Sequence, residues 1–463
     1  MSDTFDLQEL LARVAQIVAD ERTRYETQPV RADASLAELR AAFSSPLPAH
    51  GTDTEKVVEE IAAAAQPGLV ASPGPRYFGF VIGGTHPAAL AADWLTSGWD
   101  NNAGLYACGP ANAVIEEIAG RWCVELLGLP SGSSFGFVTG GMMANFAGLA
   151  AARHRVLAGA GWDVEERGLQ GAPRVRVVVG AQRHATIDMA LRYLGLGSGT
   201  VEVVPSDEQG RIDGAQLRNV LARGEAGPTI VCAQAGNVNT GAFDPFHAVC
   251  DAAQAHGAWV HVDGAFGLWA AAADDLRPLV DGVDRADSWA VDAHKWLNVP
   301  YDCGIVLCRH PDAHHGAFAA EAAYLVQGGA GGPRDGFEWV PEFSRRARGV
   351  PVYAVIRALG RDGIADLVSR CCALARRFAQ RLGAEPRVEV LNDVVLNQVL
   401  VRFDDSDDVT RAVVERVQDD GTCWMSGTVW HDRAAMRISV SNWTTTEHDV
   451  DRSVAAILHC LKR

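Results

Sequence analysis

The stretch VDAHKWLNVPYDCG, residues 291–304, decides the fold because it joins two strand-like runs and carries a lysine at the end of the first. Lys295 follows the apolar run ADSWAV and lies between His294 and Trp296, and the next run, GIVLCRH, begins where the stretch ends. A lysine at a strand end is most often a snorkelling side chain with its ammonium in water. It can also be a phosphate binder or a nucleophile, and the choice depends on what the other strand ends carry.

The flanking sequence repeats the same local pattern. The Val-rich runs PRVRVVVG, TVEVVP, TIVCAQAG and AWVHVDGAF are separated by helix-length segments such as HATIDMALRYLG and PFHAVCDAAQAHG. Short, nearly continuous apolar strands that alternate with helices predict a mainly parallel sheet covered on both faces. We expect an N-terminal helical arm at 1–75, a large α/β domain at 76–345 and a smaller α+β domain at 346–463.

Composition excludes several functional classes. The chain has 463 residues, 48% of them hydrophobic, and a formal charge of -16 from 57 acidic and 41 basic residues. Such a charge argues against nucleic acid or an anionic membrane surface as partner. No apolar stretch reaches the roughly 18 residues of a membrane span, and the N-terminus lacks the pattern of a secretory signal. The ten cysteines contain no CxxC pair, which favours reduced thiols in a cytoplasmic protein over a disulfide framework or a metal site.

Four strand ends carry polar residues that have both a structural and a chemical interpretation. The turn TGGMMANFAGL, residues 139–149, is a plain tight turn or an anion site at a helix N-terminus. His184 at the start of a helix is a cap or a catalyst. Asp263 directly after an apolar strand is a turn residue or a buried carboxylate that requires a partner. Lys295 is the fourth.

Taken together, these features indicate one cofactor. A lysine that forms a Schiff base, a carboxylate that pairs with a protonated pyridine nitrogen and a glycine turn that holds a phosphate are the groups that pyridoxal 5'-phosphate requires. Ala265, two residues after Asp263, is small enough to leave room for a flat ring.

The same residues lie in motifs that resemble those of the pyridoxal-phosphate group II amino-acid decarboxylases, over roughly residues 70–460. The motifs are PRYFGF, WLTSGWDNNAGLYACGPANAVIEE, TGGMMANFAGLAAAR, HATIDMA, HVDGAFG, DAHKWL, EFSRRARGVPVYAVIRALG and MRISVSNWTTTEHDVD. The resemblance implies the type I, aspartate aminotransferase-like fold, with a mainly parallel seven-stranded sheet in the large domain and a smaller α+β C-terminal domain. It also implies a carboxy-lyase that forms a homodimer with the active site at the subunit interface.

The resemblance also implies roles for individual residues. Lys295, Asp263 and His184 are the catalytic residues, with Lys295 as the Schiff-base lysine and His184 stacked on the cofactor ring. Ala265 packs on the other face of the ring, Gly141, Met142 and His294 contact the phosphate, and Asn145 supports the turn. Arg437 is aimed at the substrate carboxylate, although from the residues alone it is better interpreted as an edge-strand arginine in a surface ion pair. Phe80, Trp99 and Tyr106 are the candidate walls of the substrate pocket and favour an aromatic amino acid.

The product and the substrate class stay open at this point. The segment VQGGAGGPRDGFEWVPEF, residues 326–343, contains no tyrosine where the aromatic decarboxylases carry one; Gly336 or Phe337 falls near that position, and Tyr324 lies upstream. Its glycines, Gly328, Gly329, Gly331, Gly332 and Gly336, predict a flexible lid. Decarboxylation to the amine is the expected reaction; aldehyde formation, carbon–carbon cleavage and an acidic substrate such as glutamate or aspartate are the alternatives. Lys295, Asp263 and His184 argue against a catalytically silent scaffold protein. GLGSGT, residues 195–200, lacks both the GxGxxG spacing and the strand–helix context of an NAD-dependent dehydrogenase.

Overall fold

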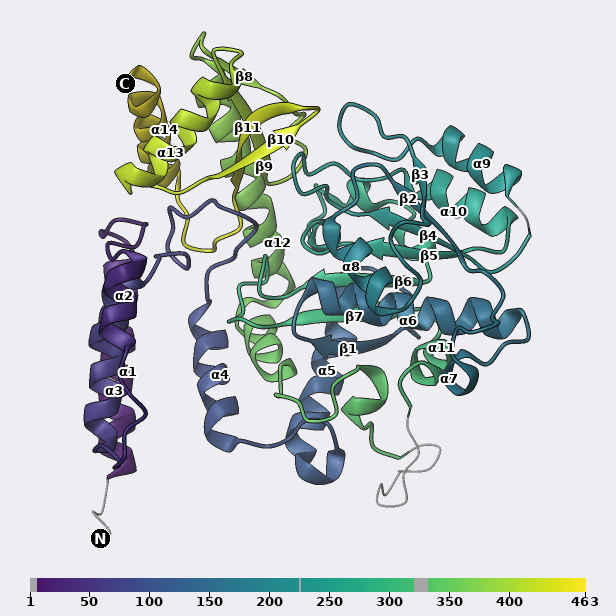
Figure 1. Ribbon diagram of the computed structural model, residues 1–463, viewed down its shortest axis with the longest axis horizontal. Helices are drawn as coiled ribbons and strands as arrows, with labels where there is room; N and C mark the ends of the chain where they lie inside the picture. The colour runs from purple at the N-terminus through teal and green to yellow at the C-terminus, as the bar shows by residue number, and fades with distance from the viewer. Residues whose placement is uncertain (1–5, 225, 320–331) are drawn as a thin grey trace.

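The strands form two sheets in the computed structural model, which describes residues 6–224, 226–319 and 332–463 (Figure 1). The larger sheet has seven strands in the order β1-β7-β6-β5-β4-β2-β3. Strand β7 is antiparallel to both β1 and β6, and the remaining pairs are parallel. The strands are β1 (Ser134–Val138), β2 (Arg176–Gly180), β3 (Glu202–Val204), β4 (Thr229–Gln234), β5 (Trp259–Asp263), β6 (Ser288–Asp292) and β7 (Gly304–Cys308). The predicted mainly parallel sheet is confirmed.

Strands β1, β5, β6 and β7 are buried along their whole length because helices cover both faces of the large sheet. Val177 and Val179 pack with residues of α6 and α8, whereas Val178 between them packs with residues of α9 and α10. Alternate side chains of a strand point to opposite faces, so a strand covered on both sides has no exposed position and is mainly apolar. The helices around this sheet are α4 (Pro87–Trp99), α5 (Pro110–Leu126), α6 (Gly141–Gly159), α7 (Val164–Arg167), α8 (Ala185–Tyr193), α9 (Gly214–Arg223), α10 (Phe246–Ala255) and α11 (Pro311–Gly316).

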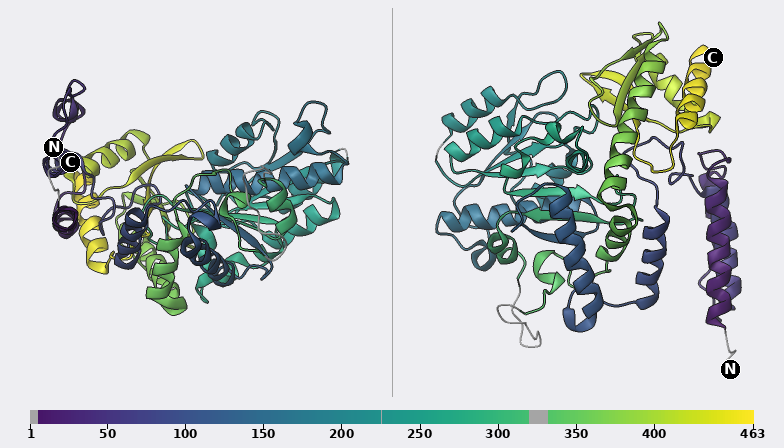
Figure 2. Two further views of the ribbon diagram at one scale, coloured as in Figure 1. Left: turned by 90° about the horizontal axis from the view of Figure 1, so that it is seen from below. Right: turned by 180° about the vertical axis from the view of Figure 1, so that it is seen from behind.

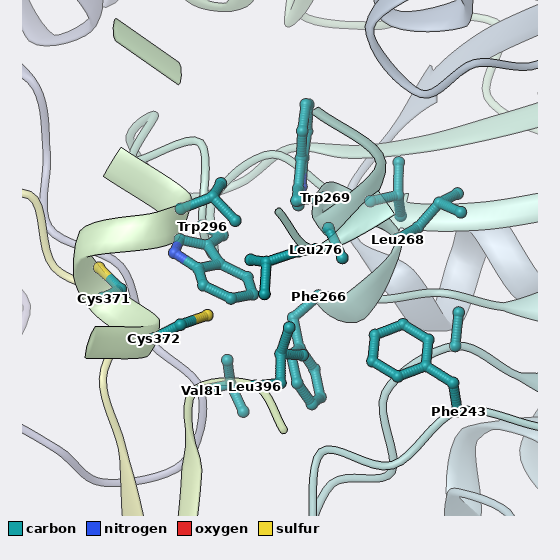
Figure 3. Packing of buried hydrophobic residues seen from close by; sticks show 14 of the residues in the cluster. Val81, Phe243, Phe266, Leu268, Trp269, Leu276, Trp296, Cys371, Cys372 and Leu396 are labelled. Carbon is teal, nitrogen blue, oxygen red and sulfur yellow. The ribbon is translucent and has the colours of Figure 1, made fainter. Parts of the chain in front are cut away.

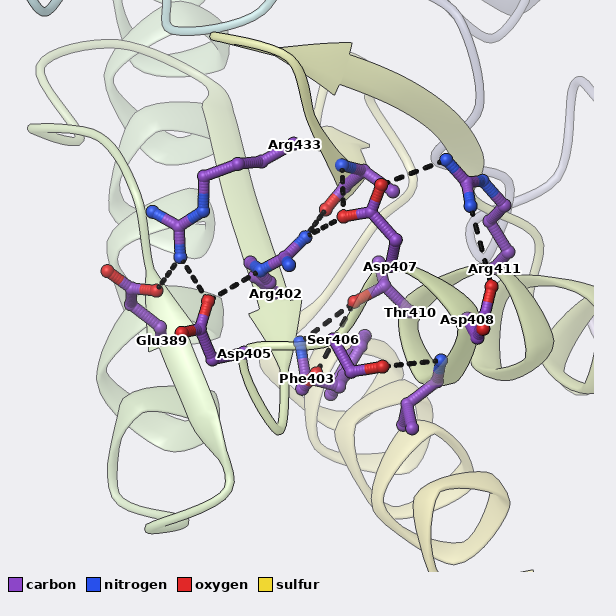
Figure 4. Close-up of polar contacts among 12 residues, drawn as sticks. Glu389, Arg402, Phe403, Asp405, Ser406, Asp407, Asp408, Thr410, Arg411 and Arg433 are labelled. Atoms are coloured by element: carbon purple, nitrogen blue, oxygen red, sulfur yellow. Dashed lines mark hydrogen bonds and ion pairs between the residues drawn. The ribbon is translucent and has the colours of Figure 1, made fainter.

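The smaller sheet is antiparallel, in the order β10-β11-β9-β8. Its strands are β8 (Val388–Val390), β9 (Gln398–Phe403), β10 (Ser426–Trp430) and β11 (Arg433–Ser439), and its helices are α12 (Gly349–Gly383), α13 (Asp407–Asp420) and α14 (Glu447–Lys462). Helix α12 breaks at Gly360, whose φ of 64° lies in the left-handed region that glycine tolerates. Arg402 on β9 bonds to Asp405 and Asp407, and Arg433 on β11 bonds to Glu389 and Asp405 (Figure 4). These pairs hold β9, β11 and the start of α13 together.

Helices α1 (Leu7–Arg24), α2 (Leu36–Phe43) and α3 (Thr54–Ala65) form an arm that stands apart from both sheets (Figures 1 and 2). None of their residues is buried. Each helix nevertheless carries large apolar side chains that are more than half exposed, among them Leu11, Leu36 and Ile61. The arm therefore has apolar side chains that no other described part of the chain covers.

The segment after the arm crosses from the small sheet to the strand ends of the large one. Phe78 donates its N–H to the carbonyl of Trp424, and further along the chain Gly84 donates to the side chain of Asn298. Beneath this crossing, Trp296 is 1% exposed and packs in the core cluster with Leu276 and the two cysteines of α12, Cys371 and Cys372 (Figure 3). The residue next to Lys295 is thus a packing residue that closes the core below the lysine.

Candidate active site

The predicted polar residues meet because their strands end at the same edge of the large sheet. Val138, Gly304 and Asp292 lie side by side in the register of β1, β7 and β6, and Asp263 ends β5 next to Ala290 of β6. Strand β7 is antiparallel, so its beginning lies beside the ends of its two neighbours. In open α/β sheets this edge is where ligands bind.

Lys295 bonds to a residue that the sequence analysis missed. Its Nζ lies 2.9 Å from Oδ2 of Asp292, a carboxylate whose side chain is 2% exposed. The other oxygen, Oδ1, lies 3.6 Å from Nε2 of His294 and accepts no hydrogen bond from the described residues. His294 accepts a hydrogen bond from the N–H of Cys303 at Nδ1. Asp292 directly follows an apolar run in the sequence, as Asp263 does. The reasoning that identified Asp263 would therefore also have identified Asp292.

The glycine turn after β1 is open to an anion. Gly140 is the N-cap of α6 and supplies no side-chain cap, so the first N–H groups of the helix have no side-chain acceptor at this position. A Cβ on Gly141 would lie 2.6 Å from Oδ2 of Asp292, so only glycine leaves this space. Met142 follows in the first turn and lies at the same edge.

His184 caps a helix and faces charged groups at the same time. Its Nδ1 accepts the N–H of Thr186 at the start of α8, which confirms the capping interpretation and leaves Nε2 for a ligand. Burial lowers the pKa of His184, and the charges of Asp263 and Lys295 act on it in opposite directions. His184 and Asp263 also line one small cavity. Oδ1 of Asp263, which is 5% exposed, accepts the N–H of Ala265.

Arg437 is not an edge-strand arginine in a surface ion pair. Strand β11 lies between β10 and β9, Arg437 is 9% exposed, and it forms no salt bridge with the residues that the structure describes. Its Nη1 donates to the carbonyl of Val238 and its Nε has no acceptor in the described part of the chain. Burial lowers its pKa to about 10, so it stays charged at neutral pH. Phe80 lies close by, with its N–H bonded to Ser426, the cross-strand neighbour of Arg437.

Comparisons with known proteins identify the family. A model described as the pyridoxal-dependent decarboxylase conserved domain matches residues 37–404. The chain belongs to this family. The resemblance inferred from the motifs is thereby confirmed, and the protein is a pyridoxal-phosphate-dependent amino-acid decarboxylase.

The relatives of this decarboxylase differ in substrate and product. It is 27% identical to tryptophan decarboxylase 1 of Oryza sativa subsp. japonica, over 96% of this chain and 91% of the relative. It is 26% identical to 4-hydroxyphenylacetaldehyde synthase of Rhodiola rosea (97% and 95%) and 28% identical to cysteine sulfinic acid decarboxylase of Homo sapiens (82% and 78%). The fold is that of the crystal structure of Oryza sativa tryptophan decarboxylase with pyridoxal phosphate and tryptamine, with a TM-score of 0.91, 24% identity, and 99% and 98% of the two chains covered.

The groups at this edge fit pyridoxal phosphate. The site contains a primary amine, a buried carboxylate at the next strand end and a helix N-terminus without a side-chain cap. A Cβ at Gly140 or Gly141 would approach His294 or Asp292, so the glycines let the backbone at the start of α6 lie close to these two side chains. In the residues that the structure describes, no group of His, Cys, Asp and Glu is placed to hold a metal ion, and no helix is long and apolar enough to cross a membrane.

Two predicted substrate residues lie away from this edge. Trp99 is the last residue of α4 and is 45% exposed, and Tyr106 opens a short 3-10 helix and donates its N–H to Asp335. No hydrogen bond or ring contact in the described residues joins either of them to Lys295 or Arg437.

The predicted lid is only partly described. Tyr324, Gly328, Gly329 and Gly331 lie outside the described residues. Phe337 is 3% exposed, packs its ring 4.7 Å from that of Phe343 and donates its N–H to the carbonyl of Gly104. In the described part of residues 326–343, the aromatic side chain near the expected tyrosine position is therefore buried in the fold.

A cavity of about 820 Å³ lies at the opposite edge of the large sheet. Trp259, Asp287 and His310 line it, at the beginnings of β5 and β6 and after the end of β7. It contains none of the predicted site residues, and its volume alone does not mark it as the active site.

Proposed function

We propose that this decarboxylase converts an aromatic L-amino acid to its amine and carbon dioxide, with Lys295 as the residue that binds the cofactor covalently. The observation that carries this assignment is the placement of the Lys295 amine, the Asp263 carboxylate and the glycine turn at one sheet edge. Lys295 would bind the aldehyde, Asp263 would hold a proton on the ring nitrogen, and the N-terminus of α6 with His294 would bind the phosphate. When bound, the cofactor supplies an electron sink for the bond to the departing carboxylate.

Arg437 supports the assignment of an amino-acid substrate. A buried guanidinium without a counterion is costly, and a substrate carboxylate would complete its bonding. Phe80 stacks on Trp424 with ring centroids 5.6 Å apart, and Trp424 stacks on Tyr77 at 5.1 Å. This group of three aromatic rings next to Arg437 favours an aromatic side chain in the substrate.

Aldehyde formation is the second candidate. Residues 326–343 contain no tyrosine, and the chain is similar to an aldehyde synthase. The similarity to cysteine sulfinic acid decarboxylase keeps an acidic substrate as the third candidate. A panel of aromatic and acidic amino acids separates all three when carbon dioxide, amine, aldehyde and peroxide are measured together. We expect equal amounts of carbon dioxide and amine from an aromatic substrate; aldehyde with peroxide, or turnover of acidic substrates only, would contradict the proposal.

The covalent residue can be identified directly because the chain has only three lysines, Lys56, Lys295 and Lys462. Borohydride reduction of the holoenzyme should fix the cofactor on the peptide that contains Lys295, as read by peptide mass mapping. Lys295→Ala should abolish this label and the associated visible absorbance. Lys56→Ala is the matched control, since the Lys56 side chain is 66% exposed and pairs only with Glu60. A label on Lys56 or Lys462 would refute the assignment.

We also propose a homodimer in which Trp99 and Tyr106 reach the site of a second copy. The exposed apolar side chains of α1–α3 and of Trp94 and Trp99 support this arrangement. Analytical ultracentrifugation should give twice the chain mass. Trp99→Ala should raise KM for the amino acid, and a monomer with full activity would contradict both statements.

A further inference from the structure

A continuous chain of hydrogen bonds connects His184 to the far end of β5. Ser288 Oγ and His261 Nδ1 are 2.8 Å apart, and His261 Nε2 lies 2.9 Å from Asn145 Oδ1. Asn145 Nδ2 donates to Thr186 Oγ1 at 3.3 Å, and Thr186 Oγ1 lies 2.8 Å from His184 Nδ1. At the other end, Trp259 Nε1 donates to Ser288 Oγ at 2.9 Å. The hydrogen-bond chain joins four separate segments of the sequence. In order, its members are Trp259, Ser288, His261, Asn145, Thr186 and His184.

Both ends of this chain have a fixed donor direction. An indole N–H can only donate, so Ser288 Oγ accepts from Trp259. At the other end the backbone N–H of Thr186 lies 3.3 Å from His184 Nδ1, which therefore accepts. If Ser288 donates to His261 Nδ1, then His261 Nε2 donates to Asn145, the amide of Asn145 donates to Thr186, and the hydroxyl of Thr186 donates to His184. Each hydrogen bond of this chain then joins one hydrogen to one acceptor.

The opposite direction does not satisfy the same groups. It requires a hydrogen on His184 Nδ1, which would then face the N–H of Thr186, a second donor. It also makes Ser288 accept from both Trp259 and His261, and its own hydroxyl hydrogen has no further acceptor within the described residues. Ser288 and His261 are both 0% exposed, so water does not substitute for the missing acceptor.

We propose that Thr186, Asn145, His261 and Ser288 are positioning residues that fix His184 as the neutral tautomer with its hydrogen on Nε2. The inference rests on the proposed function, in which His184 lies against the cofactor. His184 then offers the bound amino acid or cofactor a hydrogen-bond donor that does not depend on protonation of the ring. Asn145 thereby acts at a distance, through Thr186, in addition to any support it gives the glycine turn.

Packing and electrostatics agree with uncharged rings at both histidines of this hydrogen-bond chain. A Cβ on Gly148 would lie 2.6 Å from Cε1 of His261, so glycine on α6 makes the space for this ring. Burial lowers the pKa of His261 to about 3. Burial also lowers the pKa of His184, and the nearby charges that act on it are those of Asp263, Lys295, Arg437 and Asp292, two of each sign. Both shifts favour the uncharged rings that this direction of hydrogen bonding requires.

The test is the tautomer of His184, read by nitrogen NMR of enzyme labelled only in its histidines, with the His184 signal assigned from His184→Gln. The holoenzyme should show a hydrogen on Nε2 and none on Nδ1 from pH 6 to 8. Thr186→Val, which removes only the hydroxyl, should shift the ring toward a mixture of tautomers. We expect kcat to fall about five- to tenfold, the change for one lost hydrogen bond, with KM little altered. Thr186→Ser should restore both the signal and kcat.

Ser288→Ala tests the buried end of the chain, and Ser134→Ala is its matched control. Ser134 Oγ lies 2.9 Å from Nδ1 of His314, a similar buried serine–histidine pair outside the site. Ser288→Ala should perturb the His184 signal, and Ser134→Ala should leave it unchanged. A hydrogen on Nδ1 of His184, a charged ring, or an unchanged signal in both Thr186→Val and Ser288→Ala would overturn the inference. The signal does not depend on turnover, so a failure of the proposed decarboxylation would be seen separately in the product panel.

Discussion

Glu116 on α5 pairs with the buried Arg345 and with Arg334, whose side chain is 16% exposed. Its Oε1 lies 2.8 Å from Nη1 of Arg345 and 3.5 Å from Nη1 of Arg334, and the side chains of Glu116 and Arg345 are 4% and 0% exposed. Burial lowers the pKa of Arg334 to about 10, so this arginine remains charged at neutral pH. Within the described residues, Glu116→Ala therefore removes the counterion of the buried Arg345 and of the partly exposed Arg334.

The expected loss can be worked from these contacts. Removing one partner of a buried ion pair costs roughly 3–5 kcal/mol because the remaining charge stays desolvated. Two features of the site reduce that cost. First, Arg345 keeps its hydrogen bonds to the carbonyls of Ala103 and Phe137. Second, the substitution also removes Oε2 of Glu116, a buried oxygen that has no partner in the described residues and is therefore itself unfavourable. We therefore expect Glu116→Ala to lower the free energy of unfolding by about 3 kcal/mol.

The measurement is urea unfolding of the holoenzyme at pH 7.5, followed by circular dichroism and by hydrogen exchange of the α5 amides. Glu125→Ala is the control on the same helix, because Glu125 pairs with Arg361 and their side chains are 67% and 51% exposed. An exposed pair contributes at most about 1 kcal/mol. A loss below about 1 kcal/mol for Glu116→Ala, or equal losses for both variants, would refute the reasoning.

Three further predictions concern the site and its pH dependence. Asp263→Ala should fold but lower kcat on the order of a hundredfold, and near-normal turnover with the best substrate would contradict its role. Asp292→Asn removes a negative charge next to the glycine turn and should increase the affinity of the apoenzyme for pyridoxal phosphate several-fold in an absorbance titration; weaker binding would show that the carboxylate helps to build the site. Burial lowers the pKa of both His261 and His314 to about 3, so only the unfolded chain takes up their protons as the pH falls below about 6.5. The free energy of unfolding keeps this contribution above that pH, and at pH 5 it should be lower by roughly 2 kcal/mol per histidine in urea titrations. A free energy of unfolding that is equal at pH 5 and pH 7.5 would contradict this.

Much of the candidate active site could be predicted from local sequence because its residues follow recognisable strands. Asp263 stands directly after an apolar run and Lys295 follows one within four residues, and a polar side chain at the end of a buried strand requires a partner. The same rule would have found Asp292. Arg437 could be assigned only through the resemblance, since an arginine in a short strand gives no local sign of whether that strand is central or at an edge.

The sequence by itself determined the elements and the parallel character of the large sheet, because the apolar periodicity of each strand records how many of its faces are buried. Only the tertiary structure decided which elements are neighbours. Strand β7 is a short apolar strand like the parallel ones, and its antiparallel insertion between β1 and β6 depends on pairing with β1, which lies far earlier in the chain. The hydrogen-bond chain from Trp259 to His184 has the same origin, since a hydrogen bond depends on distance and direction in space, which sequence spacing does not record.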